Sequence, residues 1–206
     1  MRISGGMAAG RLLKVPKGFS VRPTPDLVKQ AVFNSLGGWI TGLRVLELFA
    51  GSGALGLECL SRGAMSVVAI ERASRHAILI RENVQATGLP AHRYQLRTQD
   101  VFHAIAQLAE NGQRFDLIMA DPPFGEKNLG KRSESLSQQL LDDPALPRLL
   151  EAEGLLVLGH TKRDTLTLTA SWEEAKCLKH GDSVMRFLRR REAEPTVPNP
   201  GTEAGL

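Results

Sequence analysis

Cysteine is scarce in this chain, which has only Cys59 and Cys177 among its 206 residues. Two cysteines so far apart fit neither a disulfide framework nor the paired spacing of a zinc site. Long apolar runs are also missing, since no stretch approaches the roughly 18 residues that a membrane span requires. Residues 1–6 do not resemble a signal peptide. We therefore expect a soluble, unprocessed protein of the reducing cytoplasm, without a membrane partner or a bound metal.

Acidic residues are absent from the first 22 positions, although the whole chain has 22 of them against 26 lysines and arginines. A basic stretch without acids is either a solvated terminus or a surface for phosphate groups. Phosphate contacts set affinity without selecting a base sequence. The candidate contact residues are Arg2, Arg11, Lys14, Lys17 and Arg22.

The same N-terminal region predicts a small extension on the main domain. Short β pieces around residues 10–15 suggest a hairpin. A helix should follow, with Thr24 as its N-cap and Pro25 at its first helical position, and should end at Gly37-Gly38. We assign residues 1–38 to this extension.

From residue 43 onward, strand-like apolar segments alternate with helix-like segments, which is typical of a doubly wound α/β fold. We predict one main domain over residues 39–191, closed by an antiparallel hairpin, and a disordered tail over residues 192–206, which has few large apolar residues. The predicted strands span residues 43–49, 66–71, 93–98, 115–120, 154–159, 165–169, 173–179 and 183–190. The predicted helices between them span residues 54–62, 74–87, 101–111 and 134–150.

The chain is organised around the glycine-rich stretch from Val45 to Gly56, where a buried strand passes through a tight turn into a helix. Glycines at 51 and 53 leave room for a ligand against the backbone. The spacing also fits the G-x-G-x-x-G fingerprint, so a nicotinamide or flavin enzyme is one alternative, and a simple helix-packing turn is another. The carboxylate of Glu47 would repel a pyrophosphate but would suit an ammonium group. The pattern E-x-F-x-G-x-G is similar to the first motif of S-adenosylmethionine-dependent methyltransferases.

Polar groups follow the next two predicted strands. Glu71 ends the second strand, 20 residues after Gly51, and is placed to accept hydrogen bonds from a ribose diol. Asp100 follows the third strand and could reach an adenine amino group, with the backbone N–H of Val101 available to a ring nitrogen. The structural alternatives are a helix N-terminal acid for Glu71 and a helix N-cap for Asp100.

The sharpest signal is the run from Asp121 to Phe124, with the sequence Asp-Pro-Pro-Phe. Two consecutive prolines must end the strand and hold the backbone rigid. Oxygen acceptors from Asp121 and Pro122 would grip the N–H groups of a nucleobase amine and point its lone pair at an electrophilic methyl. The ring of Phe124 offers a face on which that base could stack. The alternative is an ordinary turn after a buried strand.

The chain resembles the RsmD-type family of methyltransferases, which modify the exocyclic N2 of a guanine in 16S ribosomal RNA. The resemblance covers about residues 1–190, including the N-terminal stretch that generic methyltransferases lack. The matching stretches are Met1–Gly6, Gly10–Pro16, Arg22–Thr24, Val32–Asn34, Leu46–Gly56, Leu60–Ala64, Phe115–Ile118, Asp121–Phe124 and Gly181-Asp182. The family would have an acid where this chain has Gly159, and it more often has tyrosine where this chain has Phe124.

The resemblance implies a Rossmann-like class I fold with a mostly parallel seven-stranded sheet and S-adenosylmethionine as the cofactor. It implies a monomer that acts on 16S rRNA within an assembling small subunit, with the five basic residues of the N-terminal region on the RNA. The implied cofactor site comprises Glu47, Phe49, Gly51, Gly53, Glu71, Arg72, Asp100, Val101 and Asp121. The implied catalytic group comprises Asp121, Pro122 and Phe124. The rival hypotheses are a DNA adenine or cytosine amino-methyltransferase, a Rossmann oxidoreductase and a non-catalytic RNA-binding module.

Overall fold

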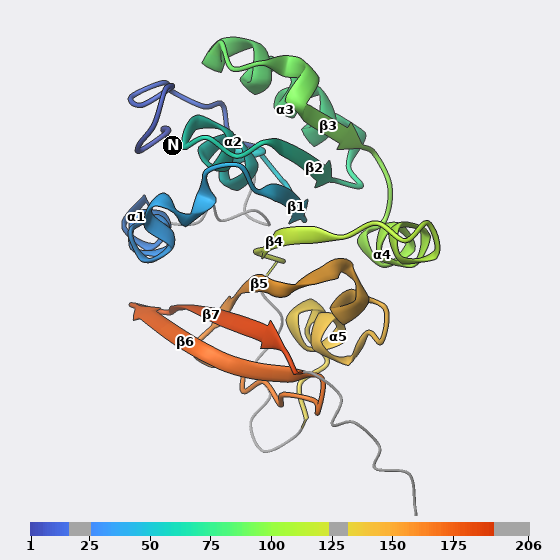
Figure 1. Ribbon diagram of the computed structural model, residues 1–206. Coiled ribbons are helices and arrows are strands. Elements are labelled where there is room, and N and C mark those ends of the chain that lie inside the picture. The colour runs from blue at the N-terminus through green and yellow to red at the C-terminus, as the bar shows by residue number, and fades with distance from the viewer. Residues whose placement is uncertain (17–25, 124–131, 192–206) are drawn as a thin grey trace, which may run out of the picture.

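The computed structural model describes residues 1–16, 26–123 and 132–191. They form a seven-stranded sheet with the strand order β3-β2-β1-β4-β5-β7-β6 (Figure 1). Strands β1 to β5 run parallel, and β7 lies antiparallel between β5 and β6. The strands are β1 Arg44–Leu48, β2 Ser66–Ile70, β3 Tyr94–Arg97, β4 Phe115–Ala120, β5 Leu150–Thr161, β6 Trp172–His180 and β7 Ser183–Arg190. The predicted fold class, a mostly parallel sheet with an antiparallel C-terminal hairpin, is confirmed.

Helices cover both faces of the sheet, which is why the central strands read as continuous apolar runs rather than alternating ones. On one face, α1, α2 and α3 pack over Val45 and Leu117; on the other, α4 and α5 pack over Leu46 and Ile118. Adjacent strand residues thus supply two separate cores, as the two-residue period of a strand requires. The helical elements are α1 Asp26–Leu36, η1 Gly37–Ile40, α2 Ala54–Ser61, α3 Ser74–Thr87, η2 Ala91–Arg93, α4 Val101–Glu110, α5 Leu136–Asp142 and η3 Leu146–Leu149.

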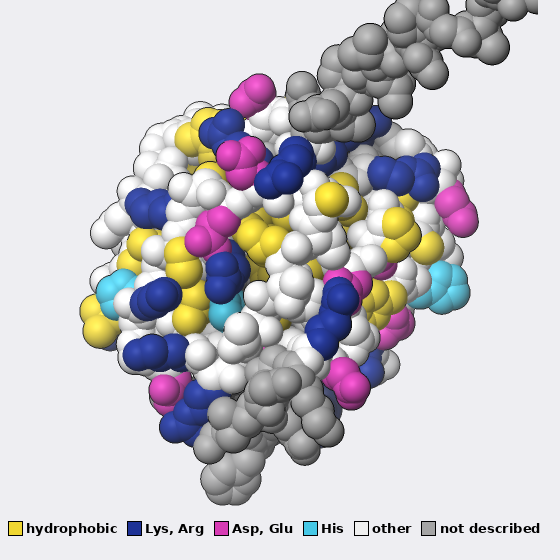
Figure 2. Space-filling model, turned by 90° about the horizontal axis from the view of Figure 1, so that it is seen from below, with side chains coloured by type: hydrophobic (Ala, Val, Ile, Leu, Met, Phe, Trp, Pro, Cys, Tyr) yellow, Lys and Arg dark blue, Asp and Glu magenta, His cyan; other side chains and the backbone are white. Residues whose placement is uncertain are grey.

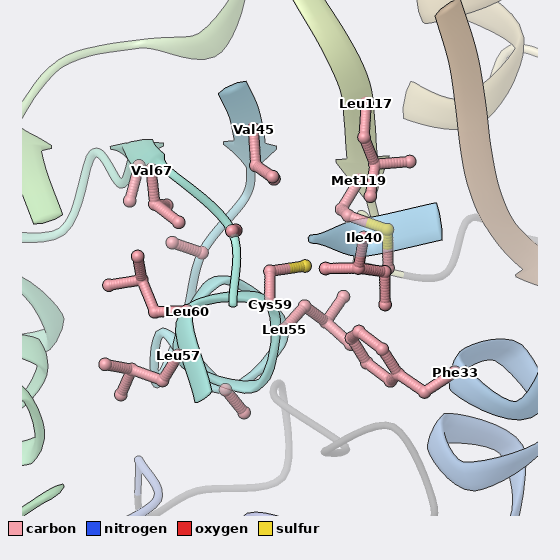
Figure 3. Close-up of a cluster of buried hydrophobic side chains, with 14 of the residues drawn as sticks. Phe33, Ile40, Val45, Leu55, Leu57, Cys59, Leu60, Val67, Leu117 and Met119 are labelled. Carbon is pink, nitrogen blue, oxygen red and sulfur yellow. The ribbon is translucent and has the colours of Figure 1, made fainter. Parts of the chain in front are cut away.

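Figure 3 shows the centre of the first core, where α2 faces the sheet. Cys59 points from α2 into this cluster near Ile40 and Met119, and it is fully buried. Phe33 reaches the same cluster from α1. The cysteine therefore serves helix packing.

Two elements near β5 differ from the sequence prediction. The helix predicted over residues 134–150 breaks after Asp142, and β5 begins at Leu150 instead of residue 154. Pro144 explains the break, because the residue before a proline is disfavoured in the helical region and Asp143 is extended. The strand predicted over residues 165–169 was wrong, since this segment joins β5 to β6 without forming a strand.

The N-terminal segment, residues 1–16, lies against α2 (Figure 1). Backbone hydrogen bonds join residues 1–3 to residues 10–13 around a single bridge between Arg2 and Leu12, so the hairpin is shorter than predicted. Ile3, Ala8 and Leu13 are buried in the first core. The division at residue 38 stays a prediction, and the segment shares the core of the main fold.

The segment also hydrogen-bonds to a buried ion pair between α1 and α2. Lys29 of α1 and Glu58 of α2 both have fully buried side chains, and Lys29 Nζ donates to Glu58 Oε2 at 2.8 Å. Lys29 also donates to the carbonyl of Arg2, and the backbone N–H of Ser4 donates to Glu58 Oε2 at 2.7 Å. Burial opposes ionisation of Glu58, but hydrogen bonds from Lys29, Ser4 and Arg62 lower its pKa below the ordinary value. The predicted N-cap Thr24 and the predicted tail, residues 192–206, lie outside the described residues.

Candidate functional site

The carboxyl ends of β1, β2, β3 and β4 meet at one edge of the sheet, because these strands are parallel neighbours. The strand order reverses between β1 and β4. These two strands pair in parallel, with Val45 opposite Leu117 and Leu48 opposite Ala120. In open α/β sheets, ligands bind outside the strand ends at such a reversal. The cofactor and catalytic residues proposed from the sequence lie at or just after these four strand ends.

The glycine-rich loop leaves β1 in an unusual backbone conformation. Phe49, Gly51 and Gly53 have positive φ angles of 56°, 57° and 75°. A positive φ is uncommon for a residue other than glycine, and such outliers cluster at functional sites. A Cβ on Gly53 would lie 2.7 Å from the hydroxyl of Tyr94. A Cβ on Gly51 would meet, among the described residues, only the Phe49 carbonyl, at 3.9 Å. The loop is thus packed at Gly53 and open at Gly51.

Glu47 lies beneath this loop and is only 1% exposed. Its Oε1 accepts a hydrogen bond from the backbone N–H of Leu55 at 3.1 Å, and its Oε2 accepts one from the Tyr94 hydroxyl at 2.9 Å. Burial raises the pKa of Glu47 to about 7, against the lowering effect of these hydrogen bonds and of the Gly56 N–H. Glu47 therefore joins β1 to the first turn of α2. A contact between Glu47 and a ligand ammonium stays a prediction.

Glu71 follows β2 and holds the loop from the other side. Its Oε2 accepts from the backbone N–H of Gly51 at 2.8 Å, and its Oε1 accepts from that of Ala73 at 2.8 Å. The bond to Ala73, just before α3, is the helix-terminus role that was the structural alternative. A carboxylate has about four acceptor sites, so two such bonds leave capacity for a ribose diol. Arg72, the next residue, is exposed.

Asp100 caps α4, since its Oδ1 accepts from the N–H groups of Phe102 at 2.9 Å and of His103 at 3.3 Å. Val101 is buried beneath it. The ring of Phe102 meets that of Phe49 edge to face, with 6.4 Å between centroids. This aromatic pair joins the glycine loop to the start of α4. Phe102 was not proposed from the sequence, because nothing in its local pattern distinguishes it from a core residue.

Asp121 and Pro122 follow β4, beside the glycine loop at the end of β1. Asp121 is half-buried, Pro122 is buried and Pro123 is exposed. A Cβ on Gly159 of β5 would overlap Asp121 Oδ1 and lie 3.0 Å from its Cγ, so the carboxylate rests directly on this glycine. Ser137 of α5 donates to the Gly159 carbonyl at 2.9 Å. Phe124 lies outside the described residues.

Three of the predicted RNA-contact residues, Arg2, Arg11 and Lys14, are exposed in the N-terminal segment. Lys14 Nζ pairs with Glu82 of α3 at 2.9 Å, with 67% of the lysine side chain exposed. Lys17 and Arg22 lie outside the described residues. Figure 2, which views the molecule from the β6 and α5 side, shows basic and acidic side chains intermixed. The N-terminal segment itself contains no acidic residue, although Glu82 of α3 lies beside Lys14.

The structure hydrogen-bonds Gly51 of the glycine loop to Glu71, bonds Glu47 to Leu55 just after the loop, and sets Asp121 at the adjacent strand end. Sequence reasoning did not find Tyr94, which contacts Glu47, or Asn83, which contacts Ser52 of the glycine loop. It also did not find Ser137, which holds the Gly159 carbonyl beside Asp121. Among the described residues, no group of three or more His, Cys, Asp and Glu could hold a metal ion. No helix in that part of the chain is long and apolar enough to cross a membrane.

A family model described as "Conserved hypothetical protein 95" matches residues 1–189. The chain is 32% identical over 194 residues to "Ribosomal RNA small subunit methyltransferase D" of Escherichia coli K12, covering 94% of this chain and 91% of that protein. It is 35% identical over 136 residues to the protein of the same name from Haemophilus influenzae, covering 66% of this chain and 69% of that protein.

Solved structures are also similar to this chain. A hypothetical protein of Thermus thermophilus is 31% identical and has a TM-score of 0.74, covering 92% of this chain and 99% of that one. A more distant structure, complexed with SAH, is 19% identical with a TM-score of 0.61 over 77% of this chain and 48% of the other. At that identity the likeness shows the fold alone.

Proposed function

Since this chain belongs to the Conserved hypothetical protein 95 family and is an RsmD-type methyltransferase, we propose that it transfers a methyl group from S-adenosylmethionine to the exocyclic N2 amine of a guanine in 16S ribosomal RNA. Methylation of ribosomal RNA agrees with the names of relatives that match it over most of their length. The choice of a guanine N2 amine is the finer part of the proposal. The observation that carries it is the position of Asp121 and Pro122 beside the glycine loop of β1.

The residues around the glycine loop fit the cofactor. The open side of Gly51 leaves space against the backbone for its methionine part. Glu71 has acceptor capacity for the ribose, and the start of α4 at Asp100 and Val101 serves the adenine. Gln99, just before them, has a buried Nε2 atom without a hydrogen-bond partner among the described residues, and this donor suits a ring nitrogen. Phe49 and Arg72 complete the proposed cofactor site, which lies near the buried Glu47 and the packed Gly53.

The protein's own part in the chemistry is to position the amine. S-adenosylmethionine supplies an already activated methyl group when it is bound. The Asp121 carboxylate and the Pro122 carbonyl accept the two N–H groups of the guanine amine, which points the nitrogen lone pair towards the methyl. The new N–C bond forms as the S–C bond breaks, and N2 then loses a proton to solvent. The acidity of the methylated nitrogen makes a strong general base unnecessary. Phe124 stacks on the guanine.

The RNA-binding half of the proposal rests on charge. Arg2, Arg11 and Lys14 are exposed on a segment without acids, and Lys17 and Arg22 continue the same sequence. These residues contact phosphates around the target. A guanine inside a helix cannot reach the pocket, so the target is a loop base or one flipped out of its stack. We further propose that the protein acts in the cytoplasm, as a monomer, on an assembling small subunit.

The test is transfer of labelled methyl groups from S-adenosylmethionine to 16S rRNA and to small-subunit particles, with digestion to nucleosides and mass spectrometry. N2-methylguanosine is the expected product. Asp121→Ala should abolish transfer and leave SAH binding within about twofold of the parent, because Asp121 grips the amine and not the glycine loop. Glu110→Ala, at the exposed far end of α4, is the matched control.

Two results would contradict the proposal. Equal turnover by Asp121→Ala and the parent would show that Asp121 does not hold the target amine. A preference for adenine or cytosine in DNA oligonucleotides would identify a DNA amino-methyltransferase instead.

A further inference from the structure

The side chain of Asn83 in α3 contacts two segments that lie far from it in the sequence. It is only 1% exposed. Its Oδ1 accepts from the backbone N–H of Lys14 at 2.9 Å, and its Nδ2 donates to the Lys14 carbonyl at 2.9 Å. The same Nδ2 donates to the carbonyl of Ser52 at 2.9 Å. One buried amide thus ties the basic N-terminal segment to the glycine loop.

The chemistry of this link requires an amide. Two backbone carbonyls need two donors, and one backbone N–H needs an acceptor, so the orientation of the amide is fixed by its partners. An aspartate at position 83 could accept from Lys14 but could donate to neither carbonyl. An alanine would leave all three backbone groups without this partner, and the Ser52 carbonyl bond is buried.

The two linked segments belong to different halves of the proposed reaction. Ser52 lies between Gly51, which is held by Glu71, and Gly53, so it moves with the cofactor loop. Lys14 presents its side chain to solvent on the surface proposed for RNA. A ligand that orders one segment orders the amide, and the amide then orders the other segment. Sites that share the cost of ordering in this way bind their ligands cooperatively.

We propose that Asn83 is a positioning residue that couples the cofactor loop to the RNA-binding segment, so that bound cofactor strengthens RNA binding. The RNA half rests on the proposed function above, whereas the link between loop and segment does not. Thermodynamic reciprocity requires that RNA strengthen cofactor binding by the same factor. We expect a coupling factor of about fivefold or more, at the lower end of the usual range for linked sites.

The first test needs no RNA. Hydrogen–deuterium exchange is followed in a peptide covering residues 11–16, with and without saturating SAH. SAH should slow exchange at the Lys14 amide in the parent, because this N–H donates to Asn83. The effect should disappear in Asn83→Ala and in Asn83→Asp. It should persist in Thr87→Ala, which removes a buried hydrogen bond to Val84 one turn further along the same helix.

The second test measures the coupling itself. The affinity of a 16S rRNA fragment is determined with and without SAH for the parent, both Asn83 variants and Thr87→Ala, at one salt concentration. General destabilisation would change affinities in parallel and leave their ratio unchanged. We expect the ratio to fall to about one in the Asn83 variants alone. The thermal unfolding midpoint of each variant identifies any that does not fold.

The parent alone can overturn the proposal, even if no Asn83 variant folds. Unchanged exchange at residues 11–16 on SAH binding would show that the loop and the segment are not coupled. A coupling factor near one in a parent that binds and methylates RNA would do the same. If SAH slows exchange but the parent neither binds nor methylates RNA, the link stands and the proposed substrate is wrong.

Discussion

The carboxylate of Asp121 rests on the backbone of Gly159, with no space between them for a side chain. An ideal Cβ on Gly159 would overlap Asp121 Oδ1, would lie 3.0 Å from its Cγ and would also approach the sulfur of Met185 at 3.2 Å. Gly159 belongs to β5, next to β4, and its carbonyl is held by Ser137. The glycine therefore fixes where the carboxylate can lie. This geometry accounts for a glycine at the position where the family resemblance predicted an acid.

Gly159→Ala should lower kcat for methyl transfer by about tenfold or more, because the added methyl must push Asp121 into another rotamer. A displacement of about 1 Å at a positioning group can cost about a hundredfold in rate. The affinity for SAH should change by less than about twofold, since the glycine loop and Glu71 are untouched. Steady-state kinetics and SAH titration check this. An unchanged kcat would mean that the position of Asp121 does not matter for transfer.

Glu71→Ala should weaken SAH binding by about tenfold or more. The change removes the acceptor for the Gly51 N–H as well as the proposed ribose contact. Each hydrogen bond to a charged group contributes about 1.5–3 kcal/mol, so the loss of one already reaches this magnitude. Isothermal titration with SAH gives the affinity, with Glu110→Ala as the control. Wild-type affinity in Glu71→Ala would place the cofactor elsewhere.

Much of the fold follows from local sequence. The prediction for α3, residues 74–87, matches the structure at both ends, because Gly88 stops the helix in the left-handed conformation. The parallel strands followed from their apolar runs between turn signals. The prediction failed around residue 143, where the helical spacing continues across Pro144 but the helix does not. The long β5 also extends beyond its apolar run, because pairing at Leu150 with Phe115 is a tertiary contact.

The candidate site could also be predicted only in part. Residues at strand ends could be proposed from the sequence, because topology brings parallel strand ends to one edge. Tyr94 contacts Glu47 from β3, and Asn83 contacts Ser52 from α3, and both read locally as ordinary strand and helix residues. Contacts such as these depend on how elements pack in three dimensions. A single sequence carries no signal for them.

Lys29→Met should destabilise the protein by about 3–5 kcal/mol, the usual cost of removing one partner of a buried ion pair. Glu58 would keep Arg62 and Ser4 but would lose its fully buried cation. Chemical denaturation gives the free energy of unfolding. Lys179→Met, at an exposed lysine of β6, is the matched control and should change it by less than about 0.5 kcal/mol. A small effect of Lys29→Met would show that the pair contributes little net stability.

The double change Arg11→Ala and Lys14→Ala should weaken RNA binding and lower the salt dependence of the affinity. Each lost phosphate contact reduces the slope of log affinity against log salt by about one. The measurement is binding of a 16S rRNA fragment at several salt concentrations. Arg148→Ala, exposed in η3 just before the amino end of β5, is the control. An unchanged slope would place the RNA on another surface.

Glu47→Gln should reveal how much the ionised, buried carboxylate of Glu47 lowers the stability of the folded protein as the pH rises. Burial raises the pKa of Glu47 from 4.5 to about 7 in the folded protein. Between these values the folded state keeps a proton that the unfolded state has lost, so the stability contributed by Glu47 is complete below pH 4.5 and is lost as the pH rises through 7. Glutamine is neutral throughout, and it can still accept from Leu55 and donate to Tyr94.

The stability of Glu47→Gln relative to the parent should therefore rise by about 2–3 kcal/mol between pH 5 and pH 8, from a pKa shift of this size. Denaturation at both pH values measures the difference, and groups that titrate alike in both proteins cancel. Glu110→Gln, at an exposed glutamate, should show no such change. A difference that is flat with pH would mean that Glu47 is ionised in the folded protein at pH 5, and it would then present a full negative charge beneath the glycine loop.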